Sequence, residues 1–353
     1  MTRVTLQTIA EQVGVSRMTV SNAFSRPDQL SPALRERILA TAQTLGYVGP
    51  DPSARALARG TTGAVGVLLT ESLRYAFTDE VATGFLGAIV DELAPTGLAL
   101  TLLTTVEGGD VIPARDVAMD GALVYSCNPD SKATDWLIKR GLPVVFVDQV
   151  PAPGIPSVNI DDRGGARAAA QHVVDLGHRR VGIVTSSAIG PYGLLSDPAK
   201  VRVAHAPGQR MRGWLEALEP AGITPTVGQE TPYATHDDNG VVQLVLDAAP
   251  RPTAILCFSD AIAQRVVHAA QDRGLRIPQD LSVVGFDDNP LAVRMRPTLT
   301  TVRQDIEAKG HAAAAALTAE IERARTGAKG KARHLSLPTE LIVRGSTAAP
   351  SPS

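Results

Sequence analysis

The stretch Leu6-Gln-Thr-Ile-Ala-Glu-Gln-Val-Gly-Val-Ser-Arg-Met-Thr-Val-Ser-Asn-Ala-Phe-Ser25 decides how the chain is organised. Ile9 and Val13 stand four positions apart, which predicts one apolar stripe along a short helix over residues 6–13. Gly14 follows where a sharp turn needs a residue that can adopt a positive φ. A second helix should then run to about residue 25. Two short helices joined by a glycine turn predict a helix-turn-helix, whose second helix enters the major groove of DNA.

Polar side chains frame these two helices. Thr5 and Ser16 stand at the N-cap positions, where a hydroxyl accepts a hydrogen bond from the first turn of the helix. The second helix carries no carboxylate, which suits a surface laid against phosphates and base edges. A helical hairpin that only packs is the alternative. We expect the DNA-facing residues to be Thr5, Ser16, Arg17, Met18, Thr19, Ser21 and Asn22.

Length and composition indicate a globular chain of several units. With 353 residues, 44% of them hydrophobic, the chain fits two to three units with sizeable cores. No apolar run approaches the ~20 residues of a membrane helix. The first residues lack the apolar core of a signal peptide. We therefore expect a cytoplasmic protein that does not contact the membrane.

The charge is unevenly distributed along the chain. Residues 1–60 contain seven arginines against four carboxylates, a net charge of +3, and since the whole chain carries −2, the remainder carries −5. A basic end on an acidic body is typical of a small DNA-reading head attached to a larger domain that does not bind DNA.

The sequence lacks the residue patterns that would favour an enzyme. It contains no Gly-x-Ser-x-Gly elbow, no His-x-x-x-His metal pair and no Gly-x-x-x-x-Gly-Lys phosphate loop. Cys127 and Cys257 stand alone on two separate apolar strand patterns, which predicts buried free thiols rather than a disulfide or a metal site. We expect no catalytic residue, no metal and no cofactor.

A third helix and a short linker helix follow the helix-turn-helix. Ser31-Pro32 starts the third helix with a cap and a proline, and the helix ends at Gly46, so that residues 1–46 form the head. Within residues 47–60, Asp51-Pro52 and Gly60 frame a helix of about eight residues. A helix that short is marginal in water, below the ~12–15 residues usually needed. The alternative is a flexible linker.

From residue 61 onward, short apolar runs alternate with helical patterns. Runs of this kind are typical of parallel strands buried on both faces. Two series of them, joined near residues 158–162, predict two doubly wound parallel-sheet subdomains that face each other across a cleft. Residues 186–208 form a long connection interrupted by glycine and proline, which we expect at a pocket edge or on the surface.

Ligands of parallel α/β sheets bind outside the carboxyl ends of the strands. Asp260 at such an end could instead cap a helix, Asp288 could fix a turn, and the aromatic residues after the first strand could be core. The residues at these ends are Ser126, Asn128, Asp148, Ser259, Asp260, Asp287 and Asp288, with Tyr75 and Phe77 in the loop after the first strand.

Several motifs resemble the LacI/GalR (lactose-repressor/galactose-repressor) family. The head carries Val4-Thr-Leu-x-x-Ile-Ala-x-x-x-Gly-Val-Ser-x-x-Thr-Val-Ser21. The core carries Gly177-His-Arg-Arg-Val-Gly182, Phe258-Ser-Asp260, Ile277-Pro-x-Asp-Leu-Ser-Val-Val-Gly-Phe-Asp-Asp288 and Pro297-x-Leu-Thr-Thr-Val-Arg-Gln304. The resemblance implies an N-terminal all-α helix-turn-helix head and an α/β core like a periplasmic binding protein over residues 61–345. Residues 346–353 should form a disordered tail, since they are rich in Ser, Thr, Ala and Pro.

The resemblance also implies functional roles. Leu57 matches the hinge-helix leucine that opens a base step in the minor groove, where two hinge helices of a homodimer pair. Arg210 matches the arginine that clamps the effector, and Asp148 and Asp287 match the cleft carboxylates. The first subdomain should cover about residues 61–160 and 290–326, and the second about 161–289 and 327–345. The expected effector residues are Tyr75, Phe77, Asn128, Asp148, Arg210, Asp260, Asp287 and Gln304.

We therefore expect a ligand-responsive transcriptional repressor that binds an inverted-repeat operator in double-stranded DNA as a homodimer. A guanidinium and carboxylates that face a cleft suit a hydroxyl-rich effector, either a sugar or a nucleoside. A solute-binding protein would share the fold of the core, but it would not need the head. A sugar- or nucleoside-modifying enzyme is disfavoured because no catalytic pattern is present.

Overall fold

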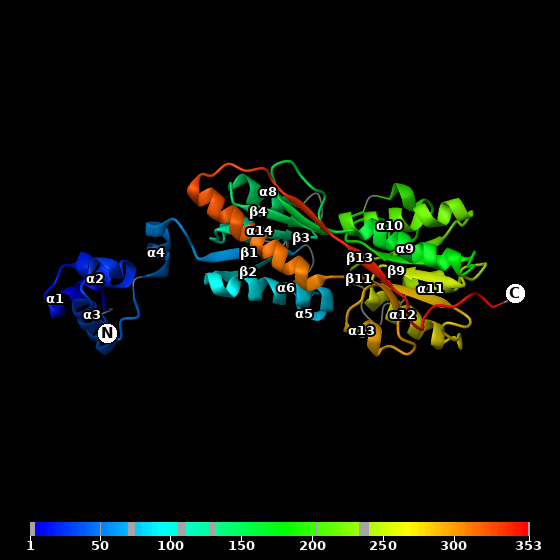
Figure 1. Cartoon of the computed structure of the whole chain (residues 1–353), viewed down its shortest axis with the longest axis horizontal. Helices are drawn as coiled ribbons and strands as arrows, with labels where there is room; N and C mark the ends of the chain where they lie inside the picture. Colours follow the sequence, from blue (N-terminus) through cyan, green and yellow to red (C-terminus); the bar gives the residue numbers. More distant parts are fainter. Residues whose placement is uncertain are drawn as a thin grey trace. The chain divides into compact units, whose positions relative to one another are not determined.

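The computed structural model describes residues 4–49, 51–69, 75–104, 111–126, 131–201, 203–232 and 240–351. The chain divides into two compact units, Met1–Gly63 and Ala64–Ser353 (Figure 1). No helix in the described ranges is both long and apolar enough to cross a bilayer.

The first unit is helical. Its elements are α1 (Leu6–Val13), α2 (Arg17–Ser25), the 3-10 helix η1 (Pro27–Gln29), α3 (Pro32–Thr44) and α4 (Pro52–Arg59). Gly14 ends α1 with φ of 75°, and Ser31 accepts a hydrogen bond from the first turn of α3. The core between the first three helices is formed by Ile9, Ala10, Val20, Ala23, Ile38 and Ala42.

The second unit contains two sheets. The first has the strand order β12-β5-β4-β3-β1-β2, and all of its pairs are parallel. Its strands are β1 (Ala64–Leu69), β2 (Ala99–Thr104), β3 (Gly121–Tyr125), β4 (Val144–Val147), β5 (Ser157–Ile160) and β12 (His334–Leu337). One face is covered by α6 and α14 and the other by α7 and α8, so both faces are buried. The helices are α5 (Tyr75–Thr78), α6 (Glu80–Leu93), η2 (Ala94–Thr96), α7 (Pro113–Asp116), α8 (Lys132–Lys139) and α14 (Ile306–Thr326).

The second sheet has the strand order β13-β11-β10-β9-β6-β8-β7, with antiparallel pairs only at its two edges. Its strands are β6 (Val181–Ser186), β7 (Gly193–Leu194), β8 (Thr226–Glu230), β9 (Ala254–Cys257), β10 (Ser282–Asp287), β11 (Thr300–Gln304) and β13 (Thr339–Ile342). Its helices are α9 (Asp162–Asp175), η3 (Pro198–Lys200), α10 (His205–Leu218), η4 (Glu219–Ala221), α11 (Gly240–Leu246), α12 (Asp260–Gln271) and α13 (Pro290–Arg294). The prediction of two doubly wound subdomains is confirmed.

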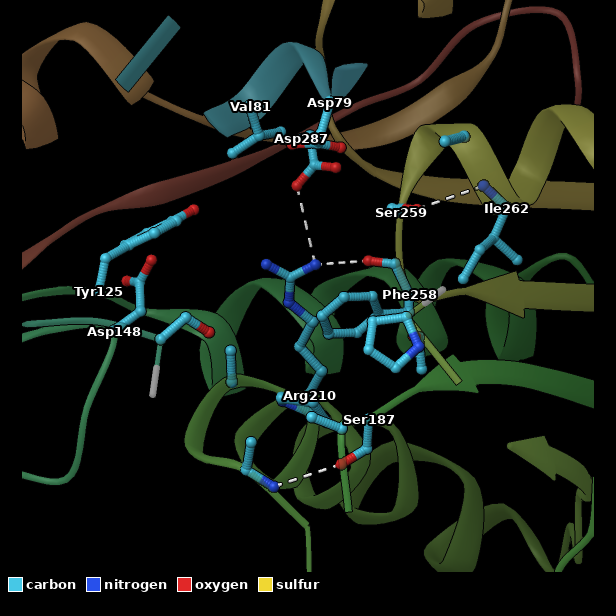
Figure 2. A pocket seen from close by; sticks show the side chains of 18 of the residues that line it. Asp79, Val81, Tyr125, Asp148, Ser187, Arg210, Phe258, Ser259, Ile262 and Asp287 are labelled. Carbon is cyan, nitrogen blue, oxygen red and sulfur yellow. Dashed lines mark hydrogen bonds and ion pairs between the residues drawn. The ribbon is translucent and has the colours of Figure 1, made fainter. Parts of the chain in front are cut away.

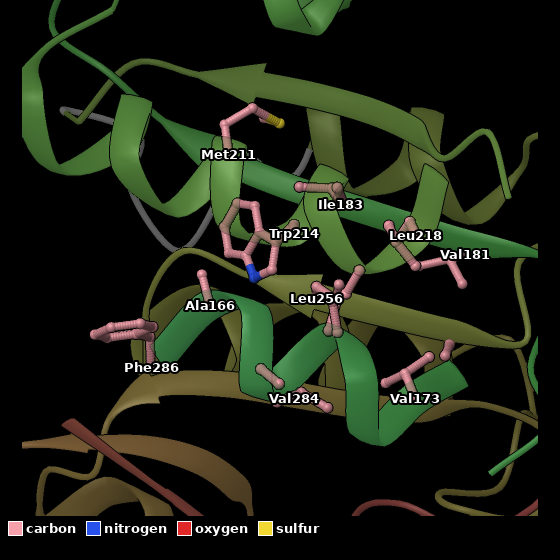
Figure 3. Close-up of a cluster of buried hydrophobic side chains, with 14 of the residues drawn as sticks. Ala166, Val173, Val181, Ile183, Met211, Trp214, Leu218, Leu256, Val284 and Phe286 are labelled. Carbon is pink, nitrogen blue, oxygen red and sulfur yellow. The ribbon is translucent and has the colours of Figure 1, made fainter. Parts of the chain in front are cut away.

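Trp214 lies at the centre of the core that α9 and α10 form against this sheet (Figure 3). The indole is 1% exposed and lies near Ala166 of α9. The two helices pack closely because residue 213 is glycine: a Cβ there would lie 2.2 Å from the carbonyl oxygen of Arg163. This contact fixes α10, the helix that carries Arg210.

The subdomain boundaries differ from the predicted ones. The segment 300–304 was expected in the first subdomain, yet β11 pairs with β10 in the second sheet, because its apolar and threonine side chains are buried there. The chain passes from the second subdomain to the first after Gln304, later than predicted, and continues into α14, which packs on the first sheet. The segment after α14 contributes a strand to each sheet: β12 pairs with β5 in the first sheet, and β13 pairs with β11 in the second (Figure 1).

The expected disorder of the tail is wrong as far as Ser351. Ser346 is fully buried; its carbonyl accepts from the N–H of Val283 in β10 at 2.9 Å, and its hydroxyl donates to the carbonyl of Val283 at 2.6 Å. The carbonyl of Ala348 accepts from Ser282 at 3.1 Å, and Ser351 donates to the carbonyl of Gln279 at 2.8 Å. Small polar residues suggested disorder, but here their hydrogen-bonding groups have partners along the second subdomain.

The long connection 186–208 is also ordered where the structure describes it. Gly193–Leu194 pairs with β8, and the side-chain amide of Gln229 donates to the carbonyls of Ile189 and Pro191 at 3.3 and 2.9 Å. These hydrogen bonds fold the connection back over the end of β6, where it borders the cavity described below.

Candidate functional site

The exposed start of α2 is the surface that the sequence assigned to DNA. Arg17 and Met18 occupy the first turn, and the Met18 side chain is 69% exposed. Thr19, Ser21 and Asn22 are partly exposed on the same helix. An arginine and an apolar side chain that project from a helix start are suited to guanine edges and thymine methyl groups.

Three of the predicted DNA residues also hold the head together. Thr5 accepts a hydrogen bond from the backbone of Thr8 and caps α1, and Ser16 accepts from Thr19 N at 3.0 Å and caps α2. The Asn22 amide donates to Gln29 Oε1 at 3.1 Å. These three residues therefore have a structural role within the head.

The helix α4 begins and ends as its sequence predicts. Asp51 Oδ1 accepts from Ala54 N at 3.1 Å, and the N–H of Gly60 bonds to the carbonyl of Ala56 at 2.8 Å. Leu57 is 87% exposed within the described chain, so an isolated short helix presents a large apolar side chain to the outside.

A cavity of about 220 Å³ lies between the two subdomains of the second unit (Figure 2). The first subdomain contributes Leu69, Ala76, Asp79, Val81, Tyr125, Ser126, Asp148 and Lys309. Gln304 lies at the crossover. The second contributes Ser186, Ser187, Ala188, Ala204, Ala206, Pro207, Arg210, Glu230, Pro232, Phe258, Ser259, Ala261, Ile262, Arg265 and Asp287.

Arg210 projects from α10 into this cavity and is held on several sides. Its Nε donates to Asp162 Oδ1 at 2.7 Å, and its Nη1 donates to the carbonyl of Phe258 and lies 3.7 Å from Asp287 Oδ1. The guanidinium carbon lies 3.5 Å from the centroid of the Phe286 ring. These contacts leave the group with a single orientation, which is what a ligand clamp requires.

The two carboxylates beside Arg210 have perturbed acidities. Burial raises the pKa of Asp162 to about 6 and that of Asp287 to about 7, in each case against the opposing charge of Arg210. Asp287 also accepts a 2.7 Å hydrogen bond from the Gln304 amide. A carboxyl group that titrates near neutrality in a cavity is typical of a functional site.

A second cationic group reaches the cavity from the first subdomain. Lys309 is 1% exposed, and its Nζ donates to Asp148 Oδ2 at 2.7 Å and to Gln304 Oε1 at 2.9 Å. On the other side of the cavity, Arg265 donates to Glu230 in a buried ion pair. Each cation among the described lining residues is therefore paired with a carboxylate.

The backbone is strained where several of these residues sit. Ser126, Asp148 and Asp287 have φ of 48°, 52° and 119°, and each lies at the carboxyl end of a strand. Non-glycine residues with positive φ cost free energy and cluster at functional sites. Backbone strain of the kind expected at a ligand site is therefore present at the carboxyl ends of β3, β4 and β10.

Matches to known proteins cover both units. Residues 5–50 match the model "Bacterial regulatory proteins, lacI family", and residues 170–347 match "Periplasmic binding protein-like domain". The chain is 37% identical over 360 residues to the HTH-type transcriptional regulator Rv3575c of Mycobacterium tuberculosis, across 99% of this chain and 98% of the relative. It is also 37% identical over 332 residues to the regulator IpsA of Corynebacterium glutamicum, across 90% and 92% of the two chains. The chain belongs to the LacI family of bacterial transcriptional regulators.

Solved structures agree with this assignment. The complex of the regulator CelR with cellobiose superposes with a TM-score of 0.69 at 29% identity, across 98% of this chain and 100% of the other. A LacI-family regulator from Corynebacterium glutamicum gives a TM-score of 0.70 at 31% identity, across 99% of both chains. The resemblance seen in the sequence is confirmed, and a DNA-binding regulator is favoured over a solute-binding protein.

The structure of this LacI-family regulator brings four predicted effector residues together: Asp148, Arg210, Asp287 and Gln304 all line the cavity. Asn128 and the side chain of Tyr75 lie outside the described residues, although the Tyr75 backbone opens α5. Phe77, expected either at the ligand or in the core, is 69% exposed and lines neither.

Asp260 does not line the cavity. Its Oδ1 accepts from Thr301 at 2.6 Å and its Oδ2 from Asn289 N at 3.1 Å, so it joins β11 to the loop after β10. The cap of α12 is Ser259, not Asp260. Asp288 forms ion pairs with Arg303 and Arg344 at 2.7 and 2.6 Å.

Sequence reasoning missed Lys309, Asp162 and the Glu230–Arg265 pair. One signal for Lys309 was available: it stands on the stripe that continues through Ala313 and Leu317, both buried in α14. A lysine on the apolar stripe of a helix predicts a buried ion pair. Among the described residues, no three His, Cys, Asp or Glu side chains gather where they could hold a metal ion.

Proposed function

We propose that this LacI-family regulator is a repressor that binds an inverted-repeat operator as a homodimer and responds to one small, uncharged, hydroxyl-rich effector in the cavity. The site of action is the cytoplasm, where the operator DNA lies, and the role does not require an enzymatic step. Sugars and nucleosides both belong to this ligand class. The effector changes the balance between two arrangements of the subdomains.

The pairing of charges in the cavity is the observation that supports an uncharged effector. Arg210 is paired with Asp162 and Asp287, Arg265 with Glu230, and Lys309 with Asp148. A phosphorylated ligand would add negative charge where the described lining residues offer no unneutralised cation. Hydroxyl groups, in contrast, can donate to the carboxylates and accept from the guanidinium and ammonium groups. CelR, which is similar in sequence and fold, is complexed with cellobiose.

The exposed apolar residue of α4 supports the homodimer. The helix has eight residues, fewer than the ~12–15 that are stable alone in water. A second copy of the same helix would stabilise it and cover part of Leu57, and the rest of that side chain would enter a base step. A twofold pair of heads then requires an operator with inverted half-sites.

A ligand panel tests the proposal. Thermal unfolding is measured with cellobiose, D-glucose, D-ribose and adenosine, and with glucose 6-phosphate as the charged counterpart. A ligand at 100 times its dissociation constant should stabilise the protein by about 2.7 kcal/mol. We expect at least one neutral compound to raise the unfolding temperature and to shift operator affinity several-fold. Binding of the phosphorylated compound alone, or binding without any change in operator affinity, would contradict the proposal.

A further inference from the structure

We propose that Lys309 and Asp148 form a specificity-determining pair that recognises two adjacent hydroxyl groups on the effector ring. The inference rests on the proposed function, because it requires a small effector in the cavity. It adds a recognition element on the first subdomain, opposite the cluster around Arg210.

The ammonium of Lys309 is held in place at the border of the cavity. The side chain is 1% exposed, and its two hydrogen bonds go to Asp148 Oδ2 and Gln304 Oε1 at 2.7 and 2.9 Å. The rings of Tyr125 and Phe85 lie 5.6 and 5.9 Å from Nζ and limit its movement. An ammonium has three N–H donors, so one remains without a hydrogen-bond acceptor among the described residues. In the proposed complex, a ligand oxygen at the border of the cavity supplies the third acceptor.

Asp148 supplies the complementary acceptor. Its Oδ2 accepts from Lys309, whereas its Oδ1 is buried without a hydrogen-bond partner in the described part of the chain. The residue follows β4 with φ of 52°, a strained conformation that keeps the carboxylate beside the cavity. A buried acceptor without a partner is costly in the free protein, and a hydroxyl donor would remove that cost.

The two groups together match adjacent hydroxyl groups. One hydroxyl oxygen accepts from Lys309 Nζ, and its neighbour on the ring donates to Asp148 Oδ1. Because Lys309 donates to Asp148 Oδ2, the proposed donor and the proposed acceptor belong to one ion pair at the border of the cavity. A ligand with a single hydroxyl group satisfies only one of them.

The competing interpretation is that Lys309 only locks the subdomains together. Gln304 accepts from Lys309 and donates to Asp287 Oδ1 at 2.7 Å, which connects Asp148 on the first subdomain to Asp287 on the second. In a lock of this kind, replacing Lys309 would change stability and affinity, but it would not change which hydroxyl groups of the ligand matter. The experiment must therefore measure selectivity among hydroxyl groups.

The test combines variants with ligand analogues. The neutral compound of the panel that binds the wild type is compared with its monodeoxy analogues, in wild type and in Lys309→Met. In the wild type, removal of either hydroxyl of the adjacent pair should weaken binding about tenfold or more, as expected for hydrogen bonds to charged groups. In Lys309→Met, removal of the hydroxyl that accepts from Nζ should cost less than about twofold.

Controls separate the possible outcomes. Lys139→Met, at an exposed lysine of α8, should keep the wild-type profile of analogues. The double variant Asp148→Asn/Lys309→Met removes both charges and provides the measurement if the single variant does not fold. It should lose selectivity for the hydroxyl group that accepts from Nζ and show a weakened preference for the other, because the amide oxygen of asparagine still accepts a hydrogen bond. A wild-type profile in the Lys309 variants would overturn this inference and leave the proposed function intact. Failure of the wild type to bind any neutral compound would overturn the proposed function, and the inference with it.

Discussion

Arg210 Nε donates a 2.7 Å hydrogen bond to Asp162, while Nη1 of the same guanidinium lies 3.7 Å from Asp287. Arg210 is thus the counter-ion of two buried carboxylates as well as a lining group of the cavity. Any substitution at this position changes the folded protein and the ligand site together.

Arg210→Ala should therefore destabilise the protein besides abolishing the effector response. Removing one partner of a buried ion pair leaves uncompensated charge, at a cost of about 3–5 kcal/mol. Denaturant titration measures this loss, and operator titration with and without effector measures the response. Arg273→Ala, which breaks an exposed pair with Asp247, is the control and should cost about 0–1 kcal/mol. Unchanged stability in Arg210→Ala would show that the carboxylates find other partners.

The acidity of Asp287 predicts a pH-dependent stability. Burial raises its pKa to about 7 from the ordinary 3.8, so the folded chain keeps a proton that the unfolded chain has released. This contribution to the free energy of unfolding is complete below about pH 4 and is lost as the pH rises through about 7. Relative to Asp287→Asn, the wild type should lose stability between about pH 4 and about pH 7, and the difference should level off at higher pH. Urea titrations of both proteins give the difference, in which the histidines cancel. A constant difference would contradict the raised pKa.

Arg17 is predicted to read a base from the first turn of α2. Arginine to guanine is the commonest specific contact in the major groove and is worth about 1–3 kcal/mol. Arg17→Ala should relax the preference at one symmetric pair of operator positions. Loss of a phosphate contact would instead weaken binding to all sequences alike. Site selection with the variant distinguishes the two results, and an unchanged motif would exclude base reading by Arg17.

Leu57 is predicted to act as a wedge in the minor groove. Leu57→Ala should leave the head folded, because the side chain is 87% exposed, yet weaken operator binding more than binding to random DNA. Fluorescence anisotropy on the two DNAs gives the ratio of affinities. Equal losses on both would mean that α4 only tethers the head.

The sequence predicted the elements whose determinants are local. The caps at Thr5, Ser16 and Asp51 and the left-handed turn at Gly14 depend on neighbouring residues, and the structure has all of them. The buried parallel strands were equally readable, because burial on both faces requires continuous apolar runs. Site residues at strand ends, such as Asp148 and Asp287, followed from the rule for ligand position in such sheets.

Features that depend on distant partners were not predictable in the same way. Lys309 can be buried because Asp148, which is distant in the sequence, accepts a 2.7 Å hydrogen bond from its Nζ through Oδ2. The tail is ordered because Ser346 hydrogen-bonds to Val283 of β10. Asp260 does not line the cavity, because its carboxylate accepts a hydrogen bond from Thr301 of β11. The boundary after β11 likewise depends on a neighbouring strand rather than on its own composition.

The closing strands β12 and β13 have a consequence for synthesis of the protein. They occupy residues 334–342 and complete one edge of each sheet. Chains emerge from the ribosome N-terminus first, so neither sheet can be completed until residues 334–342 have been translated. Both halves of the core are therefore completed by the same short segment. A premature stop between residues 305 and 333 would remove β12 and β13 and leave each sheet with an exposed strand edge open to aggregation.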